Sequence, residues 1–291
     1  MKINKDVIGG IVSSAVLLDL NISVWAGRKK DKANTDKVVA DNHAQSKDAA
    51  LVTKRLFVDN PKLDAINKQA SLIRNYLPSV TLPWMGNLKM LPIALLPAVM
   101  DELNDMKFEF DKRVQDFIQD YNVQVSGMAF KLGAMFDRAE YPHANEIAGK
   151  FKVSWDIAPV PISGDFRVDA ENSLREELRL AYEQTMTERI QEVNTLLWDK
   201  LKGCLDKLAE RLSDDEDGKS KVFRDSLVDN AVELCELLKS LNVAGDKDLE
   251  RARKDLEGAL LGVSPKDLRD QEDVRASVRE DVKSMLGKFA F

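Results

Sequence analysis

The sequence has few residues that could hold a metal ion or build a disulfide framework. Only two cysteines and two histidines occur among 291 residues, and His43 and His143 lie far apart with no partnered motif. Cys204 and Cys235 form no CxxC pair, so the sequence predicts no zinc site, no disulfide-based fold and no cofactor. Both fall at apolar positions of predicted helices, where buried thiols in a reducing compartment are the simplest interpretation.

Glycine and proline are also scarce, and common catalytic motifs are absent. The chain has 14 Gly and 9 Pro, too few for an all-β protein, which uses these residues in turns. It contains neither GxGxxG nor GxSxG, and Gly218–Ser220, a GKS, lacks the upstream glycine of a phosphate-binding loop, because Ser213 holds that position. Carboxylates are abundant but fall on helix surfaces. We therefore expect a protein that is not an enzyme.

No apolar run is long enough to span a bilayer as a helix. The stretch Val7–Leu18 is interrupted by two glycines and two serines, and Asp19 ends it. Because no small-x-small cleavage site follows, we expect an intracellular protein with neither a secretion signal nor a membrane anchor.

Amphipathic helices dominate the rest of the sequence. Apolar residues make up 44% of it and charged residues 32%, typical of a helix-rich protein. The longest apolar stripe, from Leu174 to Leu212, covers 38 residues in ten steps, a period of 3.8. A left-handed coiled coil requires 3.5, so a helix over 170–212 should pack as a strut in a bundle. Similar stripes predict helices over residues 61–76, 97–121, 125–139 and 223–241. An N-cap at Asp246 predicts a helix over 246–262, and an N-cap at Ser264 followed by Pro265 predicts one over 264–286.

Two segments alternate apolar and polar residues as half-buried strands do, residues 18–24 and 151–157. Phe166–Val168 is a candidate hairpin partner for the second. Because prolines block helix formation, residues 77–86 are expected to be an irregular linker. A lone hairpin is marginal in water, so the strands should share one sheet. The sequence predicts a mainly α (α+β) fold, a long-helix bundle with a small antiparallel β-sheet.

Charge is spread unevenly along the chain, although the formal net charge is −6. Residues 1–100 hold 14 Lys and Arg against 8 Asp and Glu, a net of +6, whereas residues 171–291 hold 21 against 28, a net of −7. We therefore distinguish a basic N-terminal region, 1–170, from an acidic helical region, 171–291, intertwined in one domain. The basic third is either a surface for an anionic partner or the result of chance beside acidic helix surfaces.

One pattern in the basic region fits nucleic-acid binding. Cationic side chains bind the phosphates of single strands, and aromatic faces stack on their bases. One aromatic residue and seven cations fit this pattern: Trp25, Arg28, Lys29, Lys30, Lys32, Lys54, Arg55 and Lys152. The alternative is that Trp25 belongs to the core and that the cations are ordinary solvated residues.

Five stretches occur in this order: Leu18–Lys30, Thr81–Trp84, Phe166–Val168, Phe223–Asn230 and Leu241–Asp246. Together they resemble a family of phage and conjugative-element proteins known only as a domain of unknown function. The resemblance spans roughly residues 15 to 260 and carries no catalytic residues. Members of that family are often encoded beside MoxR-type ATPases and von Willebrand-type proteins.

In general size and kind the chain also resembles the Drc-type single-stranded-DNA-binding transcription regulators of podophages. This resemblance implies sequence-independent binding of single-stranded DNA, in support of transcription by a phage RNA polymerase or of DNA replication. It further implies a homo-oligomer in the cytoplasm of a bacterial host cell. The alternative hypothesis is an adaptor or structural partner of a MoxR-type AAA+ ATPase that does not bind DNA and docks proteins through its long helices.

Overall fold

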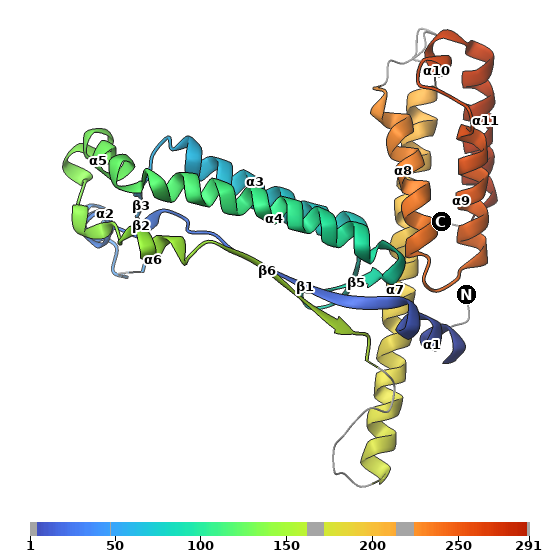
Figure 1. Ribbon diagram of the computed structural model, residues 1–291, viewed down its shortest axis with the longest axis horizontal. Coiled ribbons are helices and arrows are strands. Elements are labelled where there is room, and N and C mark those ends of the chain that lie inside the picture. Colours follow the sequence, from blue (N-terminus) through green and yellow to red (C-terminus); the bar gives the residue numbers. More distant parts are fainter. Residues whose placement is uncertain (1–4, 47, 162–171, 214–223, 290–291) are drawn as a thin grey trace. The chain divides into compact units, whose positions relative to one another are not determined.

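The structure, a computed structural model, describes residues 5–46, 48–161, 172–213 and 224–289 (Figure 1). It is 68% helical with a small antiparallel four-stranded sheet, so the predicted fold class is confirmed. Two sequence features lie outside the described residues: the candidate strand Phe166–Val168 and the GKS at Gly218–Ser220.

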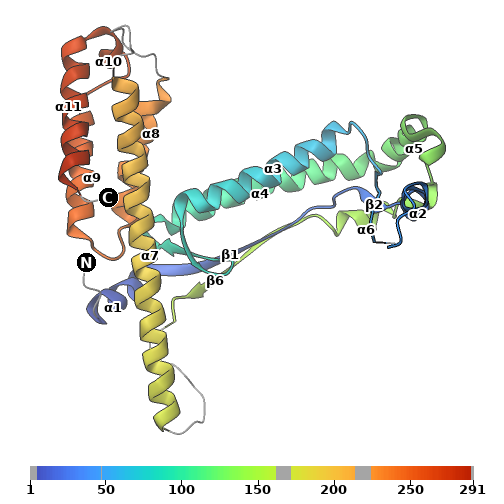
Figure 2. The same ribbon diagram turned by 180° about the vertical axis from the view of Figure 1, so that it is seen from behind.

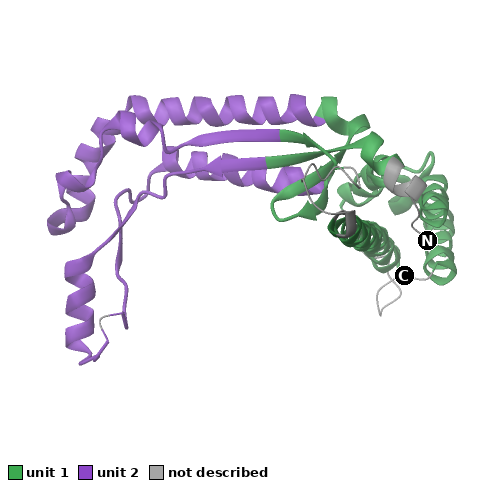
Figure 3. Cartoon of the chain, turned by 90° about the horizontal axis from the view of Figure 1, so that it is seen from below, with its two compact units in different colours: residues 1–19, 80–98, 157–291 green, residues 20–79, 99–156 purple. Residues whose placement is uncertain are grey.

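Contacts divide the chain into two compact units (Figure 3). Unit 1 comprises residues 1–19, 80–98 and 157–291, and unit 2 comprises residues 20–79 and 99–156. Both units are discontinuous in sequence. This partition follows contacts between residues, whereas the division expected at residue 170 follows charge, and the two boundaries do not coincide.

The four-stranded sheet has the order β4-β5-β1-β6. Its strands are β1 (Ala15–Ser23), β4 (Leu82–Met85), β5 (Leu88–Pro92) and β6 (Lys152–Pro159). β5 runs antiparallel to β1 and to β4. The alternating segments at 18–24 and 151–157 therefore correspond to β1 and β6, and they share one sheet as expected.

The irregular linker expected over 77–86 is wrong. Pro78 lies inside α3 (Pro61–Val80), in its last turns, and Pro83 lies in β4. β4 is an edge strand, where a missing backbone N–H is tolerated. Gly86, at φ +58°, makes the turn into β5.

Unit 1 is built around a helix bundle (Figures 1 and 2). Its helices are α1 (Lys5–Ser14), α7 (Asn172–Leu212), α8 (Ser226–Leu241), α9 (Lys247–Leu260), α10 (Asp267–Asp270) and α11 (Glu272–Lys288). The short 3₁₀ turn η1 (Ile93–Leu95) follows β5. α7 packs on α8 and α11, and α9 packs on the same two helices. The single helix expected over 264–286 is instead two, because the backbone is extended at Gln271.

The stripe of α7 is buried from its middle to its C-terminal end, as expected of a strut: Met186, Ile190, Val193, Leu197, Leu201, Leu205, Leu208 and Leu212. Its N-terminal end differs from the expectation, since Leu174 is 46% exposed. The expected buried cysteines are partly confirmed: Cys235 is buried and Cys204 half-buried. Burial raises the pKa of Cys235 to about 12 and that of Cys204 to about 11, so both thiols are protonated at neutral pH.

Unit 2 holds the second, two-stranded sheet and most of α3 and α4. Its remaining elements are β2 (Arg28–Lys30), α2 (Lys32–Asp41), β3 (Thr53–Arg55), α4 (Leu96–Gln119), α5 (Tyr121–Leu132), the turns η2 (Gly133–Met135) and η3 (Arg138–Glu140), and α6 (Ala144–Ala148). α3 and α4 lie side by side (Figures 1 and 2). The helix expected over 125–139 ends early, because the backbone leaves the helix at Gly133, φ +53°.

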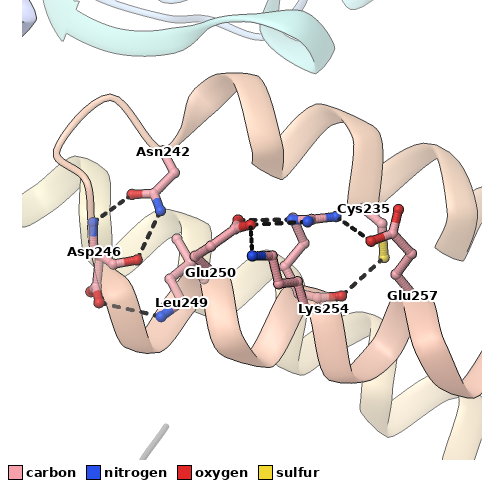
Figure 4. Close-up of polar contacts among 8 residues, drawn as sticks. Cys235, Asn242, Asp246, Leu249, Glu250, Lys254 and Glu257 are labelled. Atoms are coloured by element: carbon pink, nitrogen blue, oxygen red, sulfur yellow. Dashed lines mark hydrogen bonds and ion pairs between the residues drawn. The ribbon is translucent and has the colours of Figure 1, made fainter.

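A buried carboxylate joins α7, α8 and α9 in unit 1. Asp246 is 7% exposed and caps α9, the N-cap that the sequence predicts. It accepts hydrogen bonds from four groups: the backbone N–H groups of Asp248 and Leu249, Asn194 Nδ2 at 2.8 Å and Trp198 Nε1 at 3.2 Å. Asn242 bonds both backbone groups of Asp246 (Figure 4).

A second polar cluster ties α8 to α9 further along. Arg253, 3% exposed, donates to Glu250 and Glu257 within α9. The Cys235 thiol of α8 donates to the Arg253 carbonyl at 3.8 Å (Figure 4). The buried guanidinium is therefore neutralised within its own helix.

Replacing Asp246 by Ala should lower the free energy of unfolding of unit 1 by about 2 kcal/mol, because a helix cap and partners of buried donors are lost together. Burial alone would raise the pKa of Asp246, but its hydrogen bonds lower the pKa below its ordinary value of 3.8. The stabilisation is therefore complete above pH 3.8 and disappears as the pH falls through the lower pKa of the folded protein.

Urea unfolding of the wild type and D246A, at neutral pH and below pH 3.8, measures both effects. D248A is the matched control, because Asp248 is exposed in the same turn and its loss should cost less than about 0.5 kcal/mol. A difference in the free energy of unfolding between wild type and D246A that does not change with pH would contradict the stabilising role of the ionised Asp246 carboxylate.

Candidate nucleic-acid interface

Backbone pairing brings five of the predicted cations together in unit 2. β2 and β3 run antiparallel, with Arg28 opposite Arg55, Lys29 opposite Lys54 and Lys30 opposite Thr53. Directly paired residues share one face of a ribbon, and successive residues alternate between faces. One face therefore carries Arg28, Lys30 and Arg55, which we call the cationic face, and the other carries Lys29 and Lys54.

The cationic face is open to solvent. Arg28, Lys30 and Arg55 are all exposed, and in the described part of the chain no carboxylate lies within 4.0 Å of their charged groups. Three positive charges are thus available to an anionic partner.

One acid offsets part of the charge on the opposite face. Glu140 of η3 forms an ion pair with Lys54, and its carboxylate lies 3.9 Å from Lys29 Nζ. The Lys54 side chain is only 10% exposed, and its Nζ donates to the Met135 carbonyl at 2.8 Å. Lys54 therefore fastens the ribbon to η2 and η3, which is a different role from the phosphate contact expected of it.

The start of α2 is hydrogen-bonded to the chain that enters β3. Asp31 caps α2, and hydrogen bonds from the backbone and side chain of Asn34 lower its pKa. The Asp31 N–H donates to the Val52 carbonyl at 2.9 Å, and the Val52 N–H donates to Thr35 Oγ1 at 3.0 Å. Lys32 is exposed at the start of α2, next to the ribbon but outside its strand pairing.

Trp25 packs in an aromatic cluster that supports the ribbon. Its ring meets Phe57 edge-on at 5.6 Å and Tyr121 at 6.3 Å. Phe57 also contacts Tyr141, whose hydroxyl donates to the Leu56 carbonyl at 2.6 Å. Burial raises the pKa of Tyr141 to about 12, so this donor keeps its proton. These contacts support the core interpretation of Trp25, and we do not include it in the interface.

Lys152 begins β6 and is exposed, as its position between buried Phe151 and Val153 predicts. It belongs to the four-stranded sheet, so strand pairing does not bring it into the ribbon. Arg167, a further basic residue of the expected hairpin, lies outside the described residues.

The part of the chain that the structure describes holds neither a cluster of metal-ligating side chains nor a helix suited to a membrane. No group of three or more His, Cys, Asp and Glu side chains is arranged to hold a metal ion. No described helix combines the length and apolar character that crossing a bilayer requires.

A family model, described as "Protein of unknown function (DUF3150)", matches residues 12–225. That range is more than half of the 291 residues. The chain belongs to the DUF3150 family. No curated protein and no solved structure matches it. The DUF3150 match includes the whole ribbon and its supports, and it ends before α8. Because the family has no described function, the expected links to phages, ATPases and transcription stay predictions.

The sequence identified the cations but not Glu140. This acid is the ion-pair partner of Lys54 and lies near Lys29, so it distinguishes these two lysines from the cations without a carboxylate partner. Glu140 lies in a short 3₁₀ turn far along the chain, and no local pattern connects it to residues 29 and 54. The doublets Lys29-Lys30 and Lys54-Arg55 indicate the basic region, but they do not predict that the two segments pair as strands.

Gly27 sets the path of the chain into β2, and replacing it by Ala should loosen the ribbon. It has φ +58°, and an added Cβ would lie 3.1 Å from Leu63 Cδ2. A left-handed conformation costs a side-chain-bearing residue about 1–2 kcal/mol. Hydrogen exchange of peptides that contain 28–30 and 53–55 should accelerate in G27A.

Gly86→Ala is the matched control. Gly86 also has φ +58°, but nothing lies within 4 Å of an added Cβ, and it turns the chain between β4 and β5. G86A should leave exchange in the ribbon unchanged. Equal protection of the ribbon in G27A and the wild type would show that Gly27 does not determine its geometry.

Proposed function

We propose that the chain binds single-stranded DNA without sequence preference, through the cationic face of the β2–β3 ribbon. The observation that carries the proposal is the pairing of Arg28 with Arg55 and of Lys30 with Thr53. It gathers three exposed cations that lack carboxylate partners in the described part of the chain. Guanidinium and ammonium groups spaced along a ribbon match the repeating phosphates of a nucleic-acid strand.

The acidic total charge is compatible with this proposal, because local charge governs the approach of a partner. Residues 28–55 hold eight Lys and Arg against four Asp and Glu, a net of +4, in a chain of net −6. At physiological ionic strength charges are screened beyond about 8 Å. A phosphate at the cationic face therefore responds mainly to the ribbon and α2.

Contacts with phosphates alone carry no base specificity. The cationic face presents charged groups suited to phosphates, so the proposed binding is independent of sequence. From the resemblance to single-strand-binding regulators, we further propose a role in transcription by a phage RNA polymerase or in DNA replication, and a homo-oligomeric state.

Removing the cationic face should abolish most of the binding. The triple variant R28A/K30A/R55A should bind a labelled single-stranded oligonucleotide at least tenfold more weakly at low salt. The dependence of log affinity on log salt should flatten by roughly 2, since each phosphate contact on a single strand contributes about 0.7. Fluorescence anisotropy at several salt concentrations measures both quantities.

The triple variant K68A/R74A/K112A is the matched control, because it removes three exposed cations from α3 and α4 of the same unit. It should keep wild-type affinity within about twofold. Equal losses in the two variants would mean that only total charge matters. No loss in R28A/K30A/R55A would reject the proposal and favour the second hypothesis, an adaptor for a AAA+ ATPase.

Neutralising Glu140 should have the opposite effect. Glu140→Gln removes the negative charge beside Lys29 and Lys54 and keeps an amide oxygen that can accept from Lys54. Affinity for the oligonucleotide should rise a few-fold at low salt, and the gain should shrink as salt screens the charges. Glu146→Gln, an equal charge change at an exposed position of α6, should have little effect. An equal gain in both variants would contradict a local role for Glu140.

A further inference from the structure

α5 has a second apolar face that nothing in the described chain covers. One face packs inward through Tyr121, Val125, Met128 and Leu132. The other carries Val123, 75% exposed, and Phe130, 97% exposed, which lie two turns apart on one side of the helix. Burying a Phe side chain is worth roughly 1.5–3 kcal/mol, and Phe130 gains none of this within the described structure.

Hydrogen bonds fix Phe130 near the ribbon. Its neighbour Lys131 donates through Nζ to the Val58 carbonyl at 3.0 Å and to the Asp59 carbonyl at 3.1 Å, just beyond the end of β3. On the other side, Lys54 of β3 donates to the Met135 carbonyl. Phe130 and Met135 are five positions apart in the chain, so their Cα atoms lie at most roughly 19 Å apart. Phe130 is therefore held at the end of unit 2 that carries the ribbon, on the side of the Lys29–Lys54 face.

The charges on α5 suit an anionic strand. α5 contains no Asp or Glu, and Lys131 is its only charged residue. A second phenylalanine of unit 2, Phe108, is 70% exposed on α4, but α4 carries six Asp and Glu against three Lys and Arg. A phosphate backbone would be repelled by the acids of α4 around Phe108, whereas α5 itself contributes no negative charge.

From these observations we infer that Phe130 is the stacking platform for an unpaired base of the strand whose phosphates lie on the cationic face. The inference rests on the proposed function and deepens it, because it names what separates single strands from duplexes. The ribbon attracts the phosphates of either form. Only a single strand can offer the free face of a base to Phe130, since base faces are covered by stacking within a duplex.

The experiment compares a single-stranded oligonucleotide with the same sequence as duplex, for the wild type and for Phe130→Ala. Loss of one stacking contact should weaken single-strand binding roughly five- to hundredfold. Duplex affinity and the salt dependence should stay unchanged, because no cation is lost. The preference for single strands should therefore fall by the same factor.

Three further variants make the test specific. Phe130→Trp should restore single-strand affinity, because indole also stacks, and Phe130→Leu should not, although it remains apolar. Phe108→Ala is the matched control for removing an exposed ring, and it should bind like the wild type. Because the Phe130 side chain is 97% exposed, helicity by circular dichroism should be the same in all variants.

The outcomes separate this inference from the proposed function. If F130A binds single strands as the wild type does while R28A/K30A/R55A loses binding, the stacking role is overturned and the proposed function stands. If R28A/K30A/R55A binds normally, both are overturned. Wild-type affinity in F130L would overturn stacking in favour of a simple apolar contact. A change in sedimentation of F130A with unchanged DNA binding would identify the residue as a contact between copies of the chain, and this too would overturn the inference.

Discussion

The pairing of β2 with β3 places like charges opposite each other, which disfavours the pairing, and the rest of unit 2 offsets that repulsion. Arg28 faces Arg55 and Lys29 faces Lys54, an arrangement that is destabilising by itself. Glu140 offsets part of the charge on one face, and the aromatic cluster around Phe57 fixes the chain on both sides of the ribbon. The surface that could attract an anion thus depends on neutral packing beneath it.

Much of the fold could be predicted from the sequence because its helices carry local signals. The stripe of α7 and the cap at Asp246 are both patterns within a few turns of chain. Strands β4 and β5 were missed because Pro78 and Pro83 favour an irregular segment locally. Tertiary context determines the structure of this segment. The edge position of β4 tolerates Pro83, and the turn at Gly86 brings β5 back to pair with both β4 and β1.

The candidate site was predictable only in composition. The basic doublets identified the right region. Which of these cations has a carboxylate partner depends on strand alternation and on Glu140, which is distant in sequence. Trp25 fits the pattern of an aromatic residue beside cations, yet its ring packs against Phe57. The sequence did not identify Phe130 as a candidate site residue, because an apolar residue on a helix is usually expected in the core. Only the fold shows that its side chain is exposed.

The boundary of the family match has a practical meaning for the bundle of unit 1. The match stops at residue 225, whereas α7 packs on α8 and α11, which follow it. A chain truncated there would present the leucines of α7, from Leu197 to Leu212, to water along one side of a 41-residue helix. Such a fragment would be prone to aggregate, so an expression design should retain the residues through α11.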